Sequence, residues 1–368
     1  MDTQTDNILI IDGSYGEGGG QVLRTALSLA ALLSQPVRLV NIRAGRRKPG
    51  LQAQHLTGVR AVARICAADA EGVKLGSQEM TFVPRTAPRA GIYTFDVAEA
   101  RKGGSAGAAS LVFQTVFLPL ALANGQSRLT IRGGTHVEWS PPFDYLKRVY
   151  LPTLARMGVR GKVHLKRWGW YPLGGGEMTA VIKGIGAGGA TEDERNLRCL
   201  KRLTLTERGR LLRVRGLSAT SNLPRHIARR QQCRAVQVLR EHGFNPRIEI
   251  VDNAPSKGQG TVVFLWADFE NVVAGFTSYG RLGKPAEQVA EDACRAFLAY
   301  HDSGAALDPH LADQVILPLA LASGESAFTT SQITEHLLTN VWVVEQFLGP
   351  RFKIEGEKDK PGQVWTIE

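Results

Sequence analysis

Hydrophobic and polar positions follow two different periods along this chain, and the change from one to the other recurs. In Phe117–Thr130, an apolar run ends at a glycine and is followed by an alternating stretch, which predicts a helix, a turn and a strand. Ile316–Thr329 has the same pattern and is identical at nine of fourteen positions, at a constant offset of 199 residues. The two segments predict two copies of one structural unit.

A second helix is predicted after each of these strands, and a fainter third copy precedes both. The following helices are expected at Pro142–Arg156 and Glu335–Leu348. Leu27–Leu39 again reads as helix, turn and strand, and Gln52–Ile65 supplies the next amphipathic helix. One such unit leaves a face of its sheet uncovered, so three units are expected to pack around a shared core.

A smaller inserted domain is predicted between the second and third units. We expect it to span residues 186–280, which begin in a glycine-rich run, and the large domain to comprise residues 1–185 and 281–368. The fold class is therefore α/β (or α+β), with a large domain of three repeated α/β units plus a smaller inserted α/β domain.

Positive charge is concentrated in this insert. The chain has a formal net charge of +11, and Arg195–Arg234 contains twelve Lys or Arg and one acid, Glu207. The block favours a polyanionic partner, with nucleic acid as the leading candidate, and a solvated basic face is the alternative. Strands are expected near Leu200–Leu205 and Thr261–Ala267, and a helix near His226–Glu241.

The composition is that of an ordinary globular protein, with 43% hydrophobic and 21% charged residues. The longest apolar runs, Val116–Ala123 and Val315–Ala322, are eight residues each, whereas a membrane helix needs about 20, so we expect no membrane association. The first residues lack the pattern of a signal peptide. The four cysteines form no CxxC pair, which predicts reduced thiols and a cytoplasmic protein.

Two segments have the composition of phosphate-binding loops. Asp12–Gln21 is a glycine-rich turn between a strand and a helix, although it is neither a Walker A loop nor a dinucleotide fingerprint. A tight turn that merely needs glycine is the alternative. Glu17 in this turn, close to Arg24, is suited to a hard cation such as magnesium. Arg43–Gly50 is rich in arginine, which suits phosphate, although the motif alone favours a basic surface loop.

Two of the eight histidines lie at informative places. His310 leads into the repeated helix of the last unit, and His336 lies at the start of the helix after its strand. A neutral imidazole is a good nucleophile at pH 7, and a phosphate beside a helix start gains from exposed N–H groups. Serine hydrolase and zinc enzyme motifs are absent from the sequence. A further glycine turn, Tyr171–Glu177, is expected to join two strands.

A series of motifs, in chain order, resembles the RNA 3′-terminal phosphate cyclases. The motifs are EGGGQVLR (Glu17–Arg24), IRAGRRKPGLQAQH (Ile42–His55), LVFQTVFLP (Leu111–Pro119), the Pro141–Pro142 loop, YPLGGGE (Tyr171–Glu177), LPRH (Leu223–His226), LADQ (Leu311–Gln314) and HLLTN (His336–Asn340). The resemblance covers nearly the whole chain and implies the same three-unit fold with an insert.

The resemblance also implies a reaction and a set of site residues. A histidine attacks the α-phosphorus of ATP, AMP moves to the 3′-phosphate of an RNA, and the 2′-hydroxyl closes a 2′,3′-cyclic phosphate. The nucleophile falls on His336, and a glutamate that binds magnesium or manganese falls on Glu17. Phosphate-binding positions are Arg24, Arg43, Arg46, Gln54 and His55, and ATP-binding positions are Gln114, Pro141, Tyr145, His310, Leu311, Ala312, Asp313 and Gln314.

Two departures and two alternatives accompany the resemblance. His310 stands where the family often has a tyrosine that stacks on adenine, and Tyr145 stands where a phenylalanine is common. The first alternative is a non-catalytic cyclase-like protein of ribosome assembly, which is expected to lack the nucleophilic histidine that His336 supplies here. The second is a basic RNA-binding protein without chemistry. The sequence predicts no particular oligomeric state.

Overall fold

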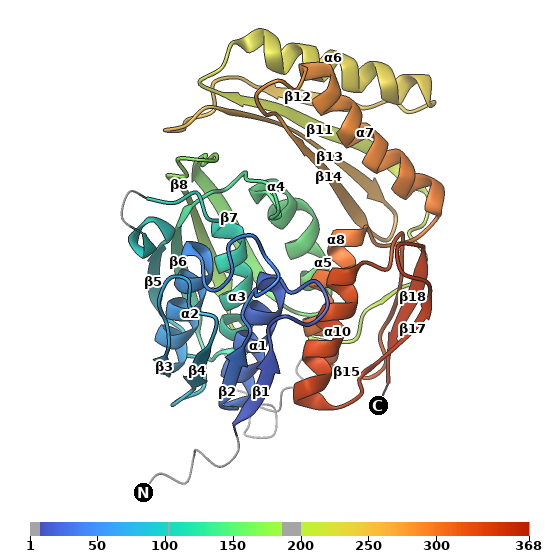
Figure 1. The fold of residues 1–368 in the computed structure, drawn as a ribbon. Helices are drawn as coiled ribbons and strands as arrows, with labels where there is room; N and C mark the ends of the chain where they lie inside the picture. Colours follow the sequence, from blue (N-terminus) through green and yellow to red (C-terminus); the bar gives the residue numbers. More distant parts are fainter. Residues whose placement is uncertain (1–7, 102–103, 186–199, 368) are drawn as a thin grey trace, which may run out of the picture.

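The computed structural model describes residues 8–101, 104–185 and 200–367, and Figure 1 shows how its elements are arranged. The first unit contains β1 (Leu9–Asp12), α1 (Gly20–Leu33), β2 (Val37–Val40), α2 (Ala53–Cys66), β3 (Asp69–Glu71) and β4 (Met80–Val83). The second contains β5 (Ile92–Asp96), η1 (Val97–Ala100), α3 (Ala109–Leu122), β6 (Gln126–Gly133), α4 (Phe143–Tyr145), a π-helical segment η2 (Leu146–Tyr150), α5 (Leu151–Arg156), β7 (Arg160–Arg167) and β8 (Gly176–Lys183).

The third unit contains β10 (Thr204–Leu205), α8 (Pro309–Gln314), α9 (Ile316–Ala320), β16 (Ala327–Thr330), α10 (Glu335–Leu348), β17 (Phe352–Gly356) and β18 (Gly362–Thr366), with β9 (Leu200–Lys201) and β15 (Ala322–Ser323) as a small parallel pair beside it. The three sheets share one design, with strand orders β1-β2-β4-β3, β5-β6-β8-β7 and β10-β16-β18-β17. In each, the first two strands are parallel and the last two antiparallel, so the prediction of three repeated units is confirmed.

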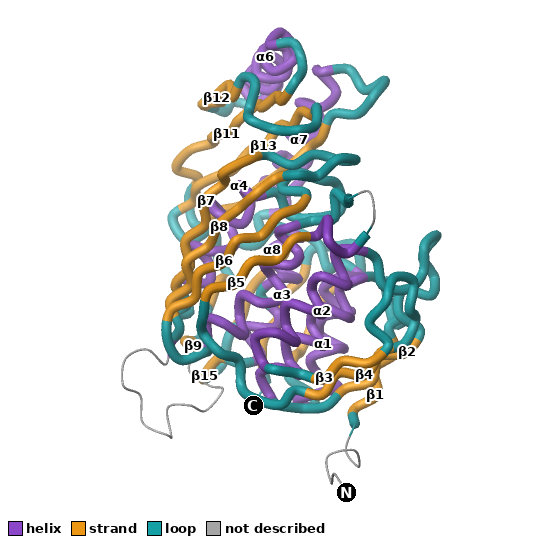
Figure 2. Tube along the Cα trace, turned by 90° about the vertical axis from the view of Figure 1, so that its left-hand side faces the viewer, coloured by secondary structure: helices purple, strands orange, loops and turns teal. Residues whose placement is uncertain are grey.

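Helix α1 lies at the centre of the shared core. It packs against α2 of its own unit, α3 of the second unit and α10 of the third. Helix α3 is buried over almost its whole length and is apolar on all sides, as expected for a helix enclosed by others rather than lying on a surface. Figure 2 shows α1, α2 and α3 side by side, with β5, β6, β7 and β8 along one flank.

The insert contains β11 (Leu211–Ser221), α6 (Arg225–Glu241), β12 (Arg247–Val251), β13 (Gly260–Phe269), β14 (Val273–Tyr279) and α7 (Ala286–Ser303). Its sheet has the order β12-β11-β13-β14, and α6 and α7 cover its outer face (Figure 1). The predicted helix and the predicted second strand fall within α6 and β13.

Strand pairing and helix packing bear on the expected domain boundaries at 186 and 280. Strands β9 and β10, expected in the insert, pair with β15 and β16 of the third unit, and α7 packs against α6 and β14 of the insert. Arg208, just before β11, is bound to the end of α7, because its guanidinium donates to the carbonyls of Tyr300 (3.2 Å) and His301 (2.7 Å). We therefore propose that the insert runs from β11 to α7, between the first strand and the first helix of the third unit.

The structure bears on three further sequence-based expectations, which concern membrane helices, the cysteines and one glycine-rich turn. Among the described residues, no helix combines the length and the apolar character that crossing a membrane requires. The described cysteines, Cys66, Cys233 and Cys294, are free thiols, and Cys199 lies outside the described residues. The turn at Tyr171–Glu177 joins β7 to β8, as expected.

A stack of aromatic rings fills the junction between the second unit and the insert. The His136 and Trp168 rings lie 3.9 Å apart, and Trp168 lies 5.5 Å from Trp170. The Trp168 N–H donates to the carbonyl of Pro255 in the insert at 2.9 Å. Burial lowers the pKa of His136, although Asp144, 3.3 Å from its Nε2, acts in the opposite direction. His136 is therefore neutral in the folded protein.

This lowered pKa predicts a loss of stability in mild acid. Below about pH 6.5, His136 binds a proton in the unfolded chain but not yet in the folded protein. The free energy of unfolding therefore decreases as the pH is lowered. Relative to a His136→Asn variant, the unmodified protein should lose up to about 1 kcal/mol per pH unit between pH 6.5 and the lower folded pKa. Urea unfolding of both proteins from pH 7 to pH 5 measures this difference, in which other titrating groups cancel. A constant difference would contradict the assignment.

Candidate active site

The glycine-rich turn between β1 and α1 holds Glu17 against the start of α10. Gly16 and Gly18 on either side have positive φ angles of 58° and 57°, a region that favours glycine. A Cβ added at Gly19 would lie 2.9 Å from both the Arg46 guanidinium and the Glu17 carboxylate. The Glu17 N–H donates to Oγ1 of Thr339 in α10 at 3.3 Å. The turn therefore needs its glycines and also positions a carboxylate.

His336 lies in the first turn of α10, next to that carboxylate. Oγ1 of Thr334 caps the helix by accepting from the Leu337 N–H at 3.1 Å. Nδ1 of His336 lies 2.6 Å from Oε2 of Glu17, and Arg46 forms an ion pair with the same carboxylate. Burial lowers the pKa of His336. The imidazole is therefore neutral near pH 7, and its Nε2 lies on the side of the ring away from Nδ1.

Hydrogen bonds connect α10 to the first and third units behind His336. Oδ1 of Asn340 accepts from Oγ1 of Thr25 at 2.7 Å, and its Nδ2 donates to the carbonyl of Asp313 at 2.8 Å. Burial raises the pKa of Asp313 to about 6. These contacts fix the register of α10 against α1 and α8, and therefore the position of His336.

A hollow that is partly open to solvent lies between α1, α3, α8 and α10. Arg24, Gln114, Asp313, Gln314 and Asn340 contribute to its lining. Nε2 of Gln114 donates to Oε1 of Gln314 at 2.6 Å, which joins the second unit to the third. Burial lowers the pKa of Arg24 to about 10, so its guanidinium is still a cation at pH 7. The hollow offers one buried cation and several amides to an anionic ligand.

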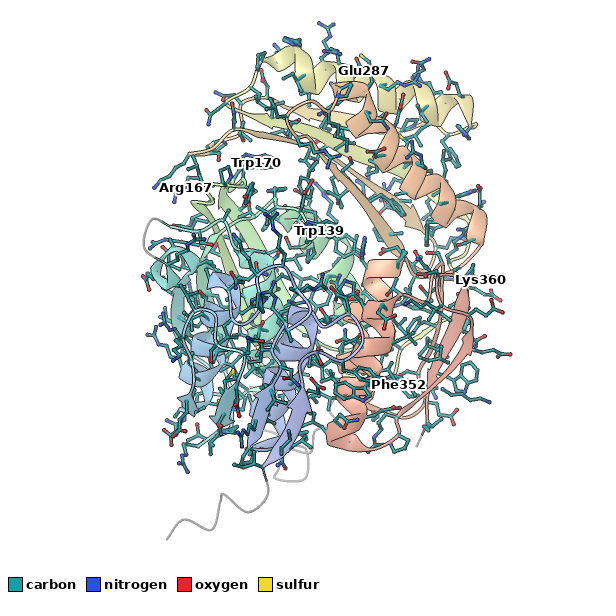
Figure 3. The ribbon with its side chains drawn as sticks, viewed as in Figure 1. Trp139, Arg167, Trp170, Glu287, Phe352 and Lys360 are labelled. Carbon is teal, nitrogen blue, oxygen red and sulfur yellow. The ribbon has the colours of Figure 1, made fainter. Side chains whose placement is uncertain are left out.

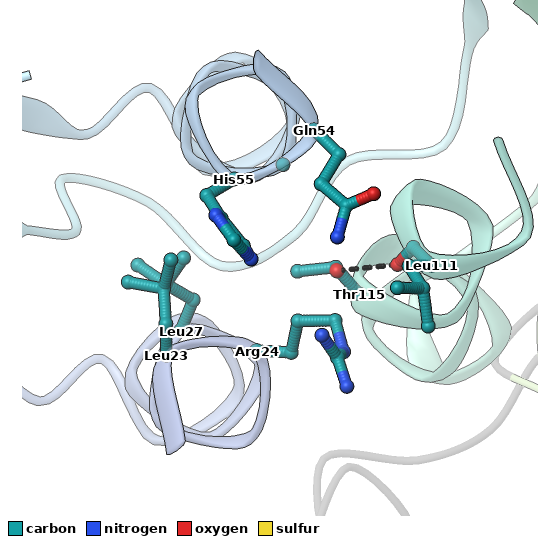
Figure 4. Close-up of a pocket in the computed structure, with 8 residues that line it drawn as sticks. Leu23, Arg24, Leu27, Gln54, His55, Leu111 and Thr115 are labelled. Carbon is teal, nitrogen blue, oxygen red and sulfur yellow. Dashed lines mark hydrogen bonds between the residues drawn. The ribbon is translucent and has the colours of Figure 1, made fainter. Parts of the chain in front are cut away.

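A second, smaller hollow lies on the other side of Arg24, where Gln54 and His55 point toward it (Figure 4). Burial lowers the pKa of His55 well below its usual value, so this ring is neutral. Nδ1 of His55 accepts from the Gln52 N–H at 3.1 Å, which leaves the hydrogen on Nε2, the atom nearest the start of α1. Oε1 of Gln54 accepts from the Ala108 N–H at 2.8 Å, so its NH₂ group is left as a donor.

The remaining predicted residues lie in loops or are buried in the helices around the hollow. Arg43 has a positive φ of 55°, and its Nη1 donates to the carbonyls of Lys48 (2.7 Å) and Gly50 (2.8 Å), so it stabilises its own loop. Leu311 and Ala312 are buried in α8, and Pro141 comes just before α4. The rings of Tyr145 and His310 meet edge to face with centroids 6.5 Å apart.

Asp308 is a residue of the site that the sequence reasoning missed. It is fully buried, and its Oδ1 accepts from the Tyr145 hydroxyl (2.8 Å) and from the N–H groups of His310 and Leu311 (both 3.0 Å). Its Oδ2 accepts from the Gly275 N–H of β14 at 3.3 Å. The sequence signal was available, because an aspartate directly before a proline is typical of a helix start.

Fold and site together define an α/β protein in which helix starts, a buried arginine and a neutral histidine lie around a hollow suited to an anionic ligand. Its residues 15–354 match the family model described as RNA 3′-terminal phosphate cyclase.

Curated relatives agree with this match. The chain is 56% identical over 341 residues to the RNA 3′-terminal phosphate cyclase of Methylococcus capsulatus, covering 92% of this chain and 91% of the relative. It is 51% identical over 359 residues to that of Nostoc punctiforme (97% and 99% covered), and 44% identical over 360 residues to that of Pyrobaculum neutrophilum (97% of each). The chain belongs to the RNA 3′-terminal phosphate cyclase family, a family of ligases, and the resemblance seen in the motifs is confirmed.

Proposed function

We propose that this protein converts the 3′-terminal phosphate of an RNA to a 2′,3′-cyclic phosphate in a reaction that consumes ATP and releases AMP and pyrophosphate. The observation that carries the proposal is the neutral His336, 2.6 Å from Glu17 at the start of α10. It lies in the same cluster of helix starts as the buried cation Arg24. Family membership supports the overall reaction, and the site supports the route below.

In the first step, Nε2 of His336 attacks the α-phosphorus of ATP. A P–N bond forms, the bond to the bridging oxygen breaks, and pyrophosphate leaves. An oxygen of the RNA 3′-phosphate then attacks the same phosphorus, so that the P–N bond breaks and AMP joins the RNA end. Finally the adjacent 2′-hydroxyl attacks the 3′-phosphorus, loses its proton to solvent and expels AMP. This last step is intramolecular and gains from proximity.

The residues around His336 have roles that follow from their contacts. Glu17 beside Nδ1 favours the tautomer with the hydrogen on Nδ1, which leaves the Nε2 lone pair free to attack. The cation Arg24 and the donors of Gln54 and His55 suit phosphate oxygens, and partial enclosure strengthens these interactions. Gln114, Gln314 and the exposed His310 lie on the side where we place the nucleoside.

Glu17 is also the residue that we propose to hold a divalent cation, magnesium or manganese. Oε2 of Glu17 and Nδ1 of His336 lie 2.6 Å apart and are both buried, but neither makes a hydrogen bond of regular geometry with a described residue. Among the described residues there is no cluster of three or more His, Cys, Asp or Glu suited to a metal ion. One carboxylate completed by substrate phosphates is a common arrangement for Mg²⁺. When bound, the cation would neutralise charge on the phosphates.

The non-catalytic alternative lacks support from the site. A binding protein does not need a neutral histidine held against a carboxylate, whereas His336, Glu17 and Arg24 are all present and close together. The free thiols are in keeping with a reducing compartment, so we place the reaction in the cytoplasm.

The proposed function is tested with a short RNA that ends in a 3′-phosphate. Incubation with the purified protein, ATP and magnesium should give an end that resists phosphatase and has lost one water by mass spectrometry. The matched substrate has a 2′-deoxy terminal nucleotide. It should not be cyclised, because the attacking hydroxyl is missing. An RNA end that stays sensitive to phosphatase under all conditions, with manganese also tried, would contradict the proposal.

The basic block is less available to RNA than its sequence implies. Six of its arginines form ion pairs with carboxylates that lie outside the block in sequence: Arg210 with Glu270, Arg213 and Arg215 with Asp268, Arg225 with Asp252, Arg230 with Glu287, and Arg234 with Glu291. Much of the local excess of positive charge is therefore neutralised on folding. Residues 195–199 of the block lie outside the described residues.

We still expect the insert to contribute modestly to holding the RNA backbone. The association constant for a long RNA should then fall with salt, with a log–log slope of about −0.7 for each phosphate contacted. Fluorescence anisotropy at KCl concentrations from about 50 to about 300 mM measures the association constant and gives this slope. A dinucleotide substrate provides the control, because it is too short to reach the insert. Equal slopes for the two RNAs would contradict a role for the insert.

A further inference from the structure

Trp139 is the most exposed of the large aromatic side chains in the described residues. This residue is 95% exposed, whereas Trp168 and Trp170 of the same unit are buried. A tryptophan left in water at this level gains nothing for folding, because its large apolar surface is not removed from solvent. An exposed indole is instead well suited to a ligand with a flat ring.

The backbone at Trp139 adds an independent observation. Its φ angle is 64°, a left-handed conformation that is unfavourable for a bulky residue. The surrounding loop enforces it: the Phe143 N–H donates to the carbonyl of Thr135 at 3.0 Å and closes the loop, and Oγ of Ser140 donates to the carbonyl of Val137 at 2.9 Å. Strain at an exposed side chain held by a rigid loop is typical of a ligand-binding position.

The loop joins the site to the insert. Two residues after Trp139 comes Pro141, and then Tyr145, which hydrogen-bonds to Asp308 under α8. On the other side, burial raises the pKa of Tyr279, the last residue of β14 in the insert, and the nearby charges of Asp144 and Glu138 add to it. Figure 3 shows Trp139 on the part of the large domain that faces the insert. A chain leaving the reaction centre toward the insert would pass this indole.

We propose that the indole of Trp139 stacks on a nucleobase near the 3′ end of the RNA substrate; this inference rests on the proposed function. Stacking is tolerant of sequence, since every base has a flat face, and it would fix the direction in which the RNA end enters the site. The adenine of ATP is a second source of the same chemistry. We favour a base of the RNA over adenine as the stacking partner of Trp139. Tyr145, which we place at the ATP nucleotide, is almost fully buried, whereas the Trp139 indole lies in solvent.

Binding of RNA without ATP tests the proposal separately from cyclisation. The probe is a fluorescent hexanucleotide with a 3′-phosphate, measured by anisotropy. Trp139→Ala should raise its Kd about tenfold, and Trp139→Phe should restore most of the affinity. Ile92→Ala, which removes an exposed apolar side chain of β5 in the large domain, is the control and should leave Kd unchanged. Thermal unfolding of each variant checks that the fold is kept.

Abasic substrates then locate the base. Removing the base from the terminal, second or third nucleotide should weaken binding to the unmodified protein at one of these positions only. At that position Trp139→Ala should cause no further loss, because the partner is already missing. Additive losses at all three positions, or an unchanged Kd for Trp139→Ala, would overturn the inference. A raised KM for ATP with unchanged RNA binding would assign the indole to adenine and also overturn it. Tight RNA binding without cyclisation would contradict only the proposed function.

Discussion

Replacing His336 by alanine should lower kcat/KM for cyclisation of an RNA 3′-phosphate at least about a thousandfold, the loss expected when a covalent nucleophile is removed. Alanine offers no lone pair to the α-phosphorus, and no other described histidine shares the contact with Glu17. The side chain of His336 is 45% exposed, so the fold should survive. The activity is measured with radiolabelled RNA, and the fold is checked by thermal unfolding.

His310→Ala is the matched control for this prediction. His310 is also in the third unit and also exposed, but it lies at the start of α8 and meets the edge of Tyr145. We expect this variant to raise KM for ATP by no more than about tenfold, as for the loss of one stacking contact, with kcat largely kept. A loss of kcat in His310→Ala equal to that in His336→Ala would remove the distinction between the two histidines.

Replacing Asp308 by alanine should destabilise the protein strongly. The fully buried carboxylate accepts four hydrogen bonds, from the Tyr145 hydroxyl and from the N–H groups of His310, Leu311 and Gly275. Alanine leaves these donors buried without an acceptor, and each such loss costs about 1–3 kcal/mol. Because the losses are not fully additive, we expect the free energy of unfolding to fall by about 3–5 kcal/mol in urea.

Asp308→Asn separates the hydrogen bonds from the cavity and the charge. Its Oδ1 can still accept from Tyr145 and cap α8, whereas its Nδ2 faces the Gly275 N–H and cannot accept from it. Burial raises the pKa of Asp308, so losing the charge itself is not the main cost. Asparagine should therefore cost less than half of what alanine costs. Equal losses for the two variants would show that the hydrogen-bonded cap is not the source of the stability.

The repeated units were predictable from sequence because their signal is local. The apolar run, glycine and alternating strand in Phe117–Thr130 and Ile316–Thr329 recur with a fixed offset, and α10 begins and ends at the expected residues. Helix starts of the repeated units then supply Glu17, Arg24 and His336, so much of the site followed once the motifs were recognised.

The division of the insert was not predictable in this way. Which sheet a two-residue strand such as β10 joins depends on pairing with β16, more than a hundred residues further along the chain. The basic block shows the same limit for charge. Its local sequence contains one acid, yet folding brings five carboxylates from Asp252 to Glu291 against its arginines. Nη1 of Arg43 donates to the carbonyls of Lys48 and Gly50, and nothing in the motif reveals these contacts; phosphate binding by Arg43 stays a prediction.

Covalent labelling without RNA tests the central claim most directly. The purified protein is incubated with ATP labelled at the α-phosphate and magnesium, and the label on the chain is followed and mapped by mass spectrometry. We predict one AMP, bound through an acid-labile P–N bond to His336, in the unmodified protein and in His310→Ala, and none in His336→Ala. Label at another residue, or no label with magnesium or manganese, would contradict the account of the site.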